Sequence, residues 1–163
     1  HVKIREVPRV QWNPVQPSGN SVLDGDDVRT FLSSELGFSK EHRDLNIQRI
    51  GYVAGLVSGA GGIALTAAIA PYRDTRETAK ELVSQSGGDF VEVFVNADVE
   101  TCENRDVKGL YKAARAGKIP QFTGVSDPYE APETPDLEIK TGDISVAESI
   151  DAVIEYLKEQ KYI

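Results

Sequence analysis

Strand-like and helix-like segments alternate along this chain, and that alternation constrains the fold more than any other feature of the sequence. Apolar runs typical of strands occur at SVLD, IALTAAIA, FVEVFVN and DLEIK. Between and after these runs, helix-like spacing of apolar residues predicts helices over residues 27–36, 40–57, 74–86, 99–105 and 146–160. Strands that alternate with helices predict an α/β fold, a three-layer sandwich whose mainly parallel sheet buries strands such as IALTAAIA.

The glycine-rich stretch VSGAGGIALT, residues 57–66, looks at first like a phosphate-binding loop. A Walker A loop reads G-x-x-x-x-G-K-[ST] and stands between a strand and the helix whose N-terminus holds the phosphates. Here Gly61 is followed by Gly62 and Ile63, and the order is helix, glycines, strand. We therefore expect Gly59, Gly61 and Gly62 to form a helix C-cap and turn. The G-x-x-x-x-G-K-[ST] pattern occurs nowhere in the 163 residues.

Length and composition indicate one domain, which we place at residues 21–163, behind an irregular arm or remnant of a preceding segment at residues 1–20. The net charge of −8 argues against a nucleic-acid binder that uses a basic face. No apolar run approaches the ~20 residues of a membrane span. The single cysteine fits a reducing compartment, so we expect a cytoplasmic protein. Because the chain begins at His1, we also expect it to be part of a longer polypeptide.

Polar residues follow the first predicted strand, at the edge where open parallel sheets bind their ligands. Asp24 and Asp26 stand at the end of SVLDGD. Their carboxylates could hold Mg²⁺ or accept a proton from a hydroxyl group, and they could equally cap the next helix. Arg29, Arg43 and Asn46 lie on the two helices that follow. These three side chains could face one anionic ligand together or belong to a solvated surface.

Two further segments could contact a ligand. Pro71 and Tyr72 end the strand IALTAAIA, where the proline could also be a simple strand stop. The segment 105–118 is basic in an otherwise acidic chain and contains two glycines, which suits a mobile lid over phosphates as well as a solvated helix. Phe122 could stack on a base or pack its loop onto the core. The basic residues of the segment are Arg105, Lys108, Lys112, Arg115 and Lys118.

Taken together, five blocks of sequence resemble the adenylylsulfate kinase family in order and spacing: LDGDDVR, LGFSKEHRDLNIQRIG, IAPYRDTR, FVEVFVNADVETCENRDVKGLYKAARAGKI and FTGVSDPYEAPETPDLEI. The resemblance implies a P-loop kinase fold. It also implies transfer of the ATP γ-phosphoryl group, with Mg²⁺ bound to ATP, to the 3′-hydroxyl of adenosine 5′-phosphosulfate (adenylylsulfate, APS). The product would be 3′-phosphoadenylylsulfate (PAPS). Because the family's Walker A loop is absent from these residues, the alternative is a catalytically inactive APS- or PAPS-binding regulatory domain of an ATP sulfurylase.

The resemblance also implies roles for individual residues and partners. Asp26 corresponds to a carboxylate that acts on Mg²⁺ indirectly and lies near the reacting hydroxyl, Asp24 supports it, and Lys108 supplies positive charge. The sequence IAPY resembles the corresponding sequence in kinase domains fused behind an ATP sulfurylase. We expect a homodimer or higher oligomer, fused to or associated with an ATP sulfurylase. The implied substrate-binding residues are Arg29, Phe38, Arg43, Asn46, Pro71, Tyr72 and Phe122, and the implied nucleotide or lid residues are Arg105, Lys112 and Arg115.

Overall fold

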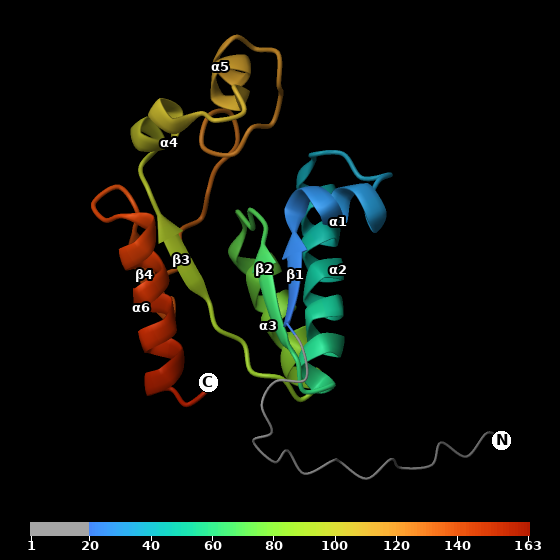
Figure 1. Ribbon diagram of the computed structural model, residues 1–163. Coiled ribbons are helices and arrows are strands. Elements are labelled where there is room, and N and C mark those ends of the chain that lie inside the picture. Colours follow the sequence, from blue (N-terminus) through green and yellow to red (C-terminus); the bar gives the residue numbers. More distant parts are fainter. Residues whose placement is uncertain (1–19) are drawn as a thin grey trace, which may run out of the picture.

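The structure is a computed structural model that describes residues 20–163. Residues 1–19, which make up almost all of the expected N-terminal arm, lie outside the described residues, and Asn20 already belongs to the first strand. Strands and helices alternate along the described chain, which confirms the predicted α/β class (Figure 1). The elements are β1 Asn20–Asp24, α1 Gly25–Phe31, α2 Lys40–Gly59, β2 Ile63–Ala67, α3 Arg73–Gln85, β3 Val93–Asn96, α4 Val99–Arg105, α5 Leu110–Arg115, β4 Leu137–Lys140 and α6 Val146–Glu159.

The described strands form two parallel pairs (Figure 1). Strand β1 pairs with β2, with Val22 opposite Leu65, and β3 pairs with β4, with Val95 opposite Ile139. Within residues 20–163 no hydrogen-bond ladder joins one pair to the other. Leu65 is 61% exposed, so the prediction that IALTAAIA is a buried strand is wrong for β2. A parallel strand is buried only where helices cover both of its faces, and among the described helices α2 makes the main contact with β2.

Helices α2 and α3 pack against each other, and α2 covers the β1–β2 pair. The buried cluster consists of Val28 of α1, Ile47 and Ile50 of α2, and Ala79 of α3. The two helices approach so closely that a Cβ atom added to Gly51 would lie 2.9 Å from the Cα of Ala79. On the other pair, α6 packs against β4. Helices α4 and α5 lie beyond the carboxyl end of β3, at the same end of the molecule as α1 (Figure 1).

The glycine cluster after α2 ends the helix and starts a turn. Helix α2 runs to Gly59, and its last carbonyls accept the N–H groups that follow: Gly61 donates to Ser58 at 2.9 Å and Gly62 donates to Val57 at 3.0 Å. Gly61 has a φ of +83°, in the left-handed region where a side chain would be strained. The predicted C-cap and turn is therefore confirmed, and this glycine cluster is not a phosphate loop.

Helix α1 begins and ends earlier than its predicted range of 27–36. It begins at Gly25 because the Asp24 side chain accepts the N–H of Asp26 at 2.8 Å and so caps the helix. It ends where the N–H groups of Leu32 and Ser33 both donate to the carbonyl of Val28. Among residues 20–163, no helix has the length and apolar character that crossing a membrane requires.

Candidate functional site

The carboxyl end of β1 brings together two residues that are far apart in the sequence. The Nζ atom of Lys108, in the segment between α4 and α5, donates to Oδ2 of Asp26 in α1. Asp24 lies beside them and caps α1, which is one of the roles that its position in the sequence allowed. The hydrogen bond from Lys108, and then the charge of Lys108, hold the pKa of the Asp26 carboxyl below its usual range. Because both side chains are exposed, they can separate to admit a ligand.

The lowered pKa limits what Asp26 can do chemically. A carboxylate that is stabilised in its ionised form is a weak proton acceptor, so Asp26 acts mainly through its negative charge and its position. Its folded-state pKa lies below the unfolded value. The contact with Lys108 therefore stabilises the fold above the unfolded pKa, and the contribution disappears as the pH falls through the folded pKa.

We predict that Lys108→Ala moves the pKa of Asp26 up toward its ordinary value, because the substitution removes both the hydrogen bond and the nearest positive charge. The measurement is an NMR pH titration of the Asp26 carboxyl carbon. Lys112→Ala is the matched control, since Lys112 lies in the same basic segment and is not a cause of the Asp26 shift. An unchanged Asp26 pKa in Lys108→Ala would show that the ion pair does not form in solution.

Two guanidinium groups lie close to one exposed aromatic ring. Phe38 is 53% exposed, and its ring centroid lies 4.4 Å from the guanidinium carbon of Arg29 and 5.5 Å from that of Arg43. Burial, and then the charge of Arg43, lower the pKa of Arg29. Two cations this close repel each other, so an anion bound beside them would be stabilised by both. The exposed face of the ring can stack on a base.

Arg43 also connects α2 to the loop that carries Phe122. Its Nε donates to the carbonyl of Phe38 at 3.0 Å, and its Nη2 donates to the carbonyl of Gln121 at 2.6 Å. Phe122 is half-buried and packs edge-on against Tyr111 of α5, with the ring centroids 5.0 Å apart. Arg43 thus fixes the segments that hold the two predicted aromatic residues with respect to each other.

Three other predicted substrate-binding residues are buried. Pro71 is fully buried, Tyr72 lies under the Lys40 ammonium group at 4.4 Å, and Asn46 is 3% exposed. The Oδ1 atom of Asn46 has no hydrogen-bond partner among the described residues. Asn46 therefore has an oxygen that a ligand could satisfy. The side chains of Pro71 and Tyr72 are packed inside the protein, so little of either is open to a ligand in this structure.

The predicted lid residues differ in what they contact. Arg105 donates to the carbonyl of Thr141 at 2.5 Å, and Arg115 forms an ion pair with Glu103 at 2.5 Å. These two arginines are thus engaged with neighbouring segments, whereas Lys112 is exposed. Gly109 and Gly117 have φ values of +68° and +71° at the two ends of α5, so the glycines do bracket a short helix.

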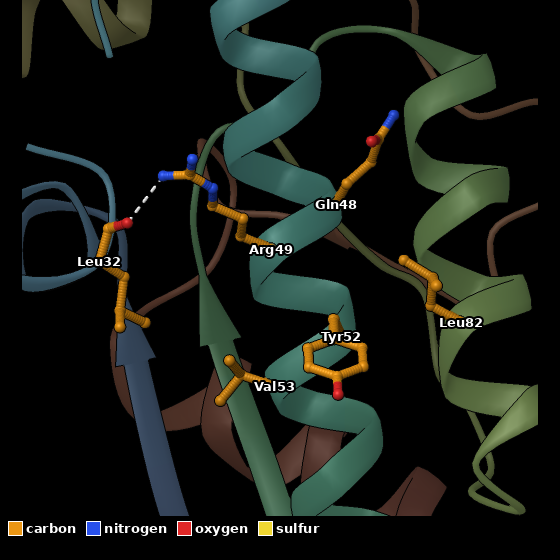
Figure 2. A pocket seen from close by; sticks show the side chains of 6 residues that line it. All are labelled: Leu32, Gln48, Arg49, Tyr52, Val53 and Leu82. Atoms are coloured by element: carbon orange, nitrogen blue, oxygen red, sulfur yellow. Dashed lines mark hydrogen bonds between the residues drawn. The ribbon is translucent and has the colours of Figure 1, made fainter. Parts of the chain in front are cut away.

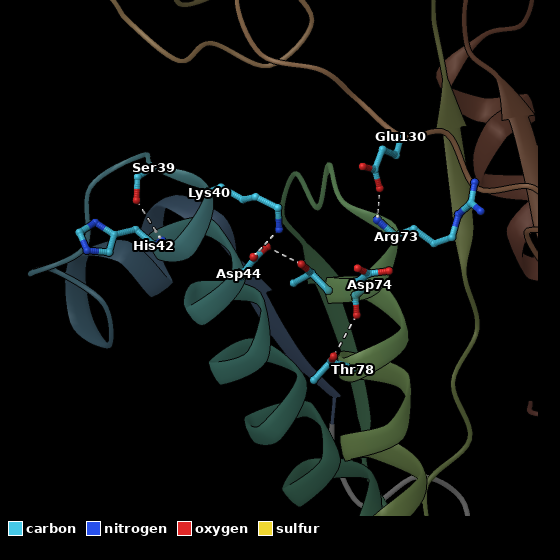
Figure 3. A network of polar contacts seen from close by, with 9 residues as sticks. Ser39, Lys40, His42, Asp44, Arg73, Asp74, Thr78 and Glu130 are labelled. Carbon is cyan, nitrogen blue, oxygen red and sulfur yellow. Dashed lines mark hydrogen bonds and ion pairs between the residues drawn. The ribbon is translucent and has the colours of Figure 1, made fainter.

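Two structural carboxylates near the site escaped the sequence analysis. Asp106 accepts the N–H groups of Tyr111 and Lys112, each at 3.0 Å, and so caps α5, whose own N-cap residue has no side chain. Asp44 accepts from Lys40 at 2.8 Å and from the hydroxyl of Thr75, which ties the start of α2 to the start of α3 (Figure 3). The spacing of Lys40 and Asp44, four residues apart on a helix, is the only one of these signals visible in the sequence.

The donor set does not form a metal site by itself. Within residues 20–163, His, Cys, Asp and Glu side chains make no group of three or more that could hold a metal ion. Asp24 is used as a helix cap and Asp26 is paired with Lys108. These residues fit a cation that arrives already bound to a ligand, with Asp26 close to it, better than a cation held by the protein alone.

One cavity lies apart from these charged residues. It measures about 360 Å³ and is lined on its apolar side by Leu32, Tyr52, Val53 and Leu82 (Figure 2). Arg49 reaches across it to donate to the carbonyl of Leu32 at 2.8 Å. None of the predicted site residues lines this cavity.

The parallel α/β framework thus gathers carboxylates and cationic groups near the carboxyl end of β1, the edge where parallel α/β proteins bind their ligands. A sequence profile of the adenylylsulphate kinase family matches residues 15–140. The adenylyl-sulfate kinase of Halothermothrix orenii is 55% identical over 141 residues, which span 86% of this chain and 74% of the relative. The chain therefore belongs to the adenylylsulphate kinase family.

Solved structures agree with this assignment. The APS kinase CysC of Mycobacterium tuberculosis, solved in complex with AMPPNP and APS, matches with a TM-score of 0.83 and 41% identity, over 86% of this chain and 80% of that one. A hexameric APS kinase from Thiobacillus denitrificans matches with a TM-score of 0.65 and 38% identity, over 88% of this chain and 23% of that one. The P-loop kinase fold that the sequence blocks implied is thus confirmed.

Proposed function

We propose that this chain binds adenylylsulfate beside Arg29, Phe38 and Arg43, and that its site serves transfer of the ATP γ-phosphoryl group to the 3′-hydroxyl, which yields PAPS. The observation that carries the proposal is the exposed Phe38 ring beside two guanidinium groups, one of which donates to the Gln121 carbonyl next to Phe122. A ring for the adenine and two cations for the sulfate and phosphate groups match the chemistry of this ligand. The relative from M. tuberculosis, whose structure contains APS, supports the same substrate.

Each residue of the site has a distinct part in the proposed reaction. Asp26 would orient the ribose hydroxyl, while Lys108 would leave Asp26 to neutralise the transferring phosphoryl oxygens. Asp24 keeps α1, and with it Asp26, in position. Mg²⁺ that arrives with ATP would lie near Asp26 and would supply further charge neutralisation. Phosphoryl transfer needs mostly alignment and positive charge, and these side chains would contribute to both.

A second candidate function, binding of APS or PAPS without catalysis, is favoured by one observation. The 163 residues contain no G-x-x-x-x-G-K-[ST] pattern, so they lack the backbone cradle and the lysine that hold ATP phosphates in this fold. Arg105, Lys112 and Arg115 remain candidates for contacts to the nucleotide. Two of these three already pair with other groups of the protein.

We predict that the 163-residue chain binds APS. We also predict that it binds ATP at least roughly 100-fold more weakly than a kinase of this family that has the phosphate loop. The reason is that two or more charge-assisted hydrogen bonds to phosphate are missing, each worth about 1.5–3 kcal/mol. Isothermal titration with APS and with AMPPNP, each with Mg²⁺, measures both affinities. Failure to bind APS would contradict the proposed site. Tight AMPPNP binding, with PAPS formed from ATP and APS, would instead remove the non-catalytic alternative.

We also propose that the domain at residues 21–163 works in the cytoplasm as a homodimer or larger assembly, fused to or associated with an ATP sulfurylase. The hexameric relative from T. denitrificans supports self-association. Light scattering on the purified chain tests it, and a monomer at micromolar concentration would contradict it.

A further inference from the structure

Glu130 forms a reciprocal pair of hydrogen bonds with the start of α3. Its Oε2 accepts the N–H of Arg73 at 2.7 Å, and its own N–H donates to the carbonyl of Pro71 at 2.8 Å. Figure 3 shows the Glu130 carboxylate directly beside Arg73, at the first turn of the helix. The two residues are 57 positions apart in the sequence, so this pair joins the loop that follows Phe122 to the start of α3.

Helix α3 needs this contact, since its own N-cap residue, Tyr72, makes no side-chain cap hydrogen bond. The first N–H groups of a helix have no partner within the helix, and a carboxylate at that end is also favoured by the helix dipole. Glu130 supplies both the acceptor and the negative charge from a distant loop. Arg73 forms a further ion pair with Glu133 at 2.7 Å, but through its exposed side chain.

The loop between Phe122 and Glu130 is held together internally. The carbonyl of Phe122 accepts the N–H groups of Val125, Ser126 and Asp127, and the N–H of Phe122 donates to the Ser126 hydroxyl at 2.8 Å. Tyr129 stacks on Phe94 of β3, with ring centroids 6.1 Å apart. Because the turn is cross-linked in this way, it moves as a unit, and its position follows from the contact of Tyr129 with β3 and from the attachments at its two ends.

Those attachment points close a ring of contacts around the proposed adenylylsulfate site. At one end of the loop, Arg43 of α2 holds the carbonyl of Gln121. At the other end, Glu130 holds the start of α3. The two helices are tied to each other where Thr75 donates to Asp44. Fixing one attachment therefore constrains the other.

We propose that Glu130 is a positioning residue for the adenylylsulfate site: its reciprocal pair with Pro71 and Arg73 sets where Phe122 stands relative to Arg43 and Phe38. The inference rests on the proposed function, because it assigns Glu130 to that site. Glu130 touches no predicted ligand-binding side chain directly. Its effect on binding passes through the main chain of Pro71 and through the loop.

The test compares E130A, E130Q and E133A in the 163-residue chain. E130A removes the acceptor at the α3 N-terminus, whereas E130Q keeps a side-chain oxygen that accepts the Arg73 N–H. E133A removes a carboxylate from the same loop and from the same arginine but leaves the reciprocal pair intact, so it is the matched control. The measurements are APS affinity by isothermal titration and the backbone amide NMR signals of Arg73 and Phe122.

We expect E130A to bind APS about tenfold more weakly, E130Q and E133A to stay within about twofold, and the Phe122 amide signal to move in E130A alone. Unchanged affinity in E130A would overturn the proposal, as would an equal loss in E133A, which would assign the effect to the charge near Arg73. If the unsubstituted chain does not bind APS, the proposed function fails separately. In that case the backbone amide signal of Phe122 tests the positioning role. A shift of this signal in E130A alone supports the role, and an unshifted signal in E130A overturns it.

Discussion

Replacing Arg43 by alanine is expected to weaken APS binding by about 100-fold, because one side chain performs three tasks at this site. Its guanidinium lies beside the Phe38 ring, its Nε holds the carbonyl of Phe38, and its Nη2 holds the carbonyl of Gln121. The variant therefore loses a cation for the anionic ligand and also the link between the two segments that carry the aromatic residues. Isothermal titration with APS measures the change.

Two further variants separate these contributions. R43K keeps the charge, but a single ammonium group does not reproduce the planar fork that donates to two carbonyls, so an intermediate loss is expected. R49A removes another arginine of α2. Arg49 contacts Leu32 and Glu35 and contacts none of the proposed ligand-binding residues. Its APS affinity should change by less than about threefold. Equal affinities for R43K and the unsubstituted chain would show that charge alone matters, and equal losses in R43A and R49A would contradict the site.

Features set by neighbouring residues could be predicted from the sequence. Ser39 caps α2 by accepting the N–H of His42, and α4 spans residues 99–105 as expected. The end of α2 at the glycine cluster was predicted because the cap is made by atoms within a few residues. Such signals depend on local backbone geometry, which a sequence pattern reports directly.

Contacts between distant segments could not be predicted in the same way. Lys108 and Asp26 were both singled out as candidates, but 82 residues separate them and no local pattern pairs them. Asp106 and Glu130 cap helices that begin several or many residues away, so each looks like an ordinary loop carboxylate in the sequence. Residue type and family resemblance therefore selected the charged groups of the site, and the structure was needed to show which of them meet.

Burial was the property that the sequence predicted least well. Pro71 and Tyr72 were placed among the ligand-binding residues because they end a strand, but their side chains are buried. Conversely, the apolar run IALTAAIA forms a strand with Leu65 exposed. An apolar run reports the surroundings that a strand prefers, whereas the exposure of its side chains depends on whether other elements cover both faces of the strand.

The largest effect on stability is expected from a valine at Gly51. A Cβ atom at this position would lie 2.9 Å from both the Cα and the Cβ of Ala79, closer than packed side chains approach. Helices α2 and α3 would have to move apart, and the buried cluster of Ile47, Ile50 and Ala79 would loosen. Overpacking of this kind costs about 1–3 kcal/mol. Because valine adds two methyl groups beyond Cβ, we expect Gly51→Val to cost an amount at the upper end of this range. This corresponds to a fall in Tm of roughly 6–10 °C for a chain of this length.

Thermal unfolding followed by circular dichroism measures this fall, and two variants show that it arises from the contact with α3. Tyr52→Val introduces the same residue one position further along α2, where the side chain is 54% exposed, and should change Tm by only a few degrees. Gly51→Ala combined with Ala79→Gly should be more stable than Gly51→Ala alone, because it removes one of the two contacting atoms. The recovery should be partial, since the Cα of residue 79 remains in the way. A Tm for Gly51→Val equal to that of Tyr52→Val would mean that the helices do not approach at Gly51 in solution.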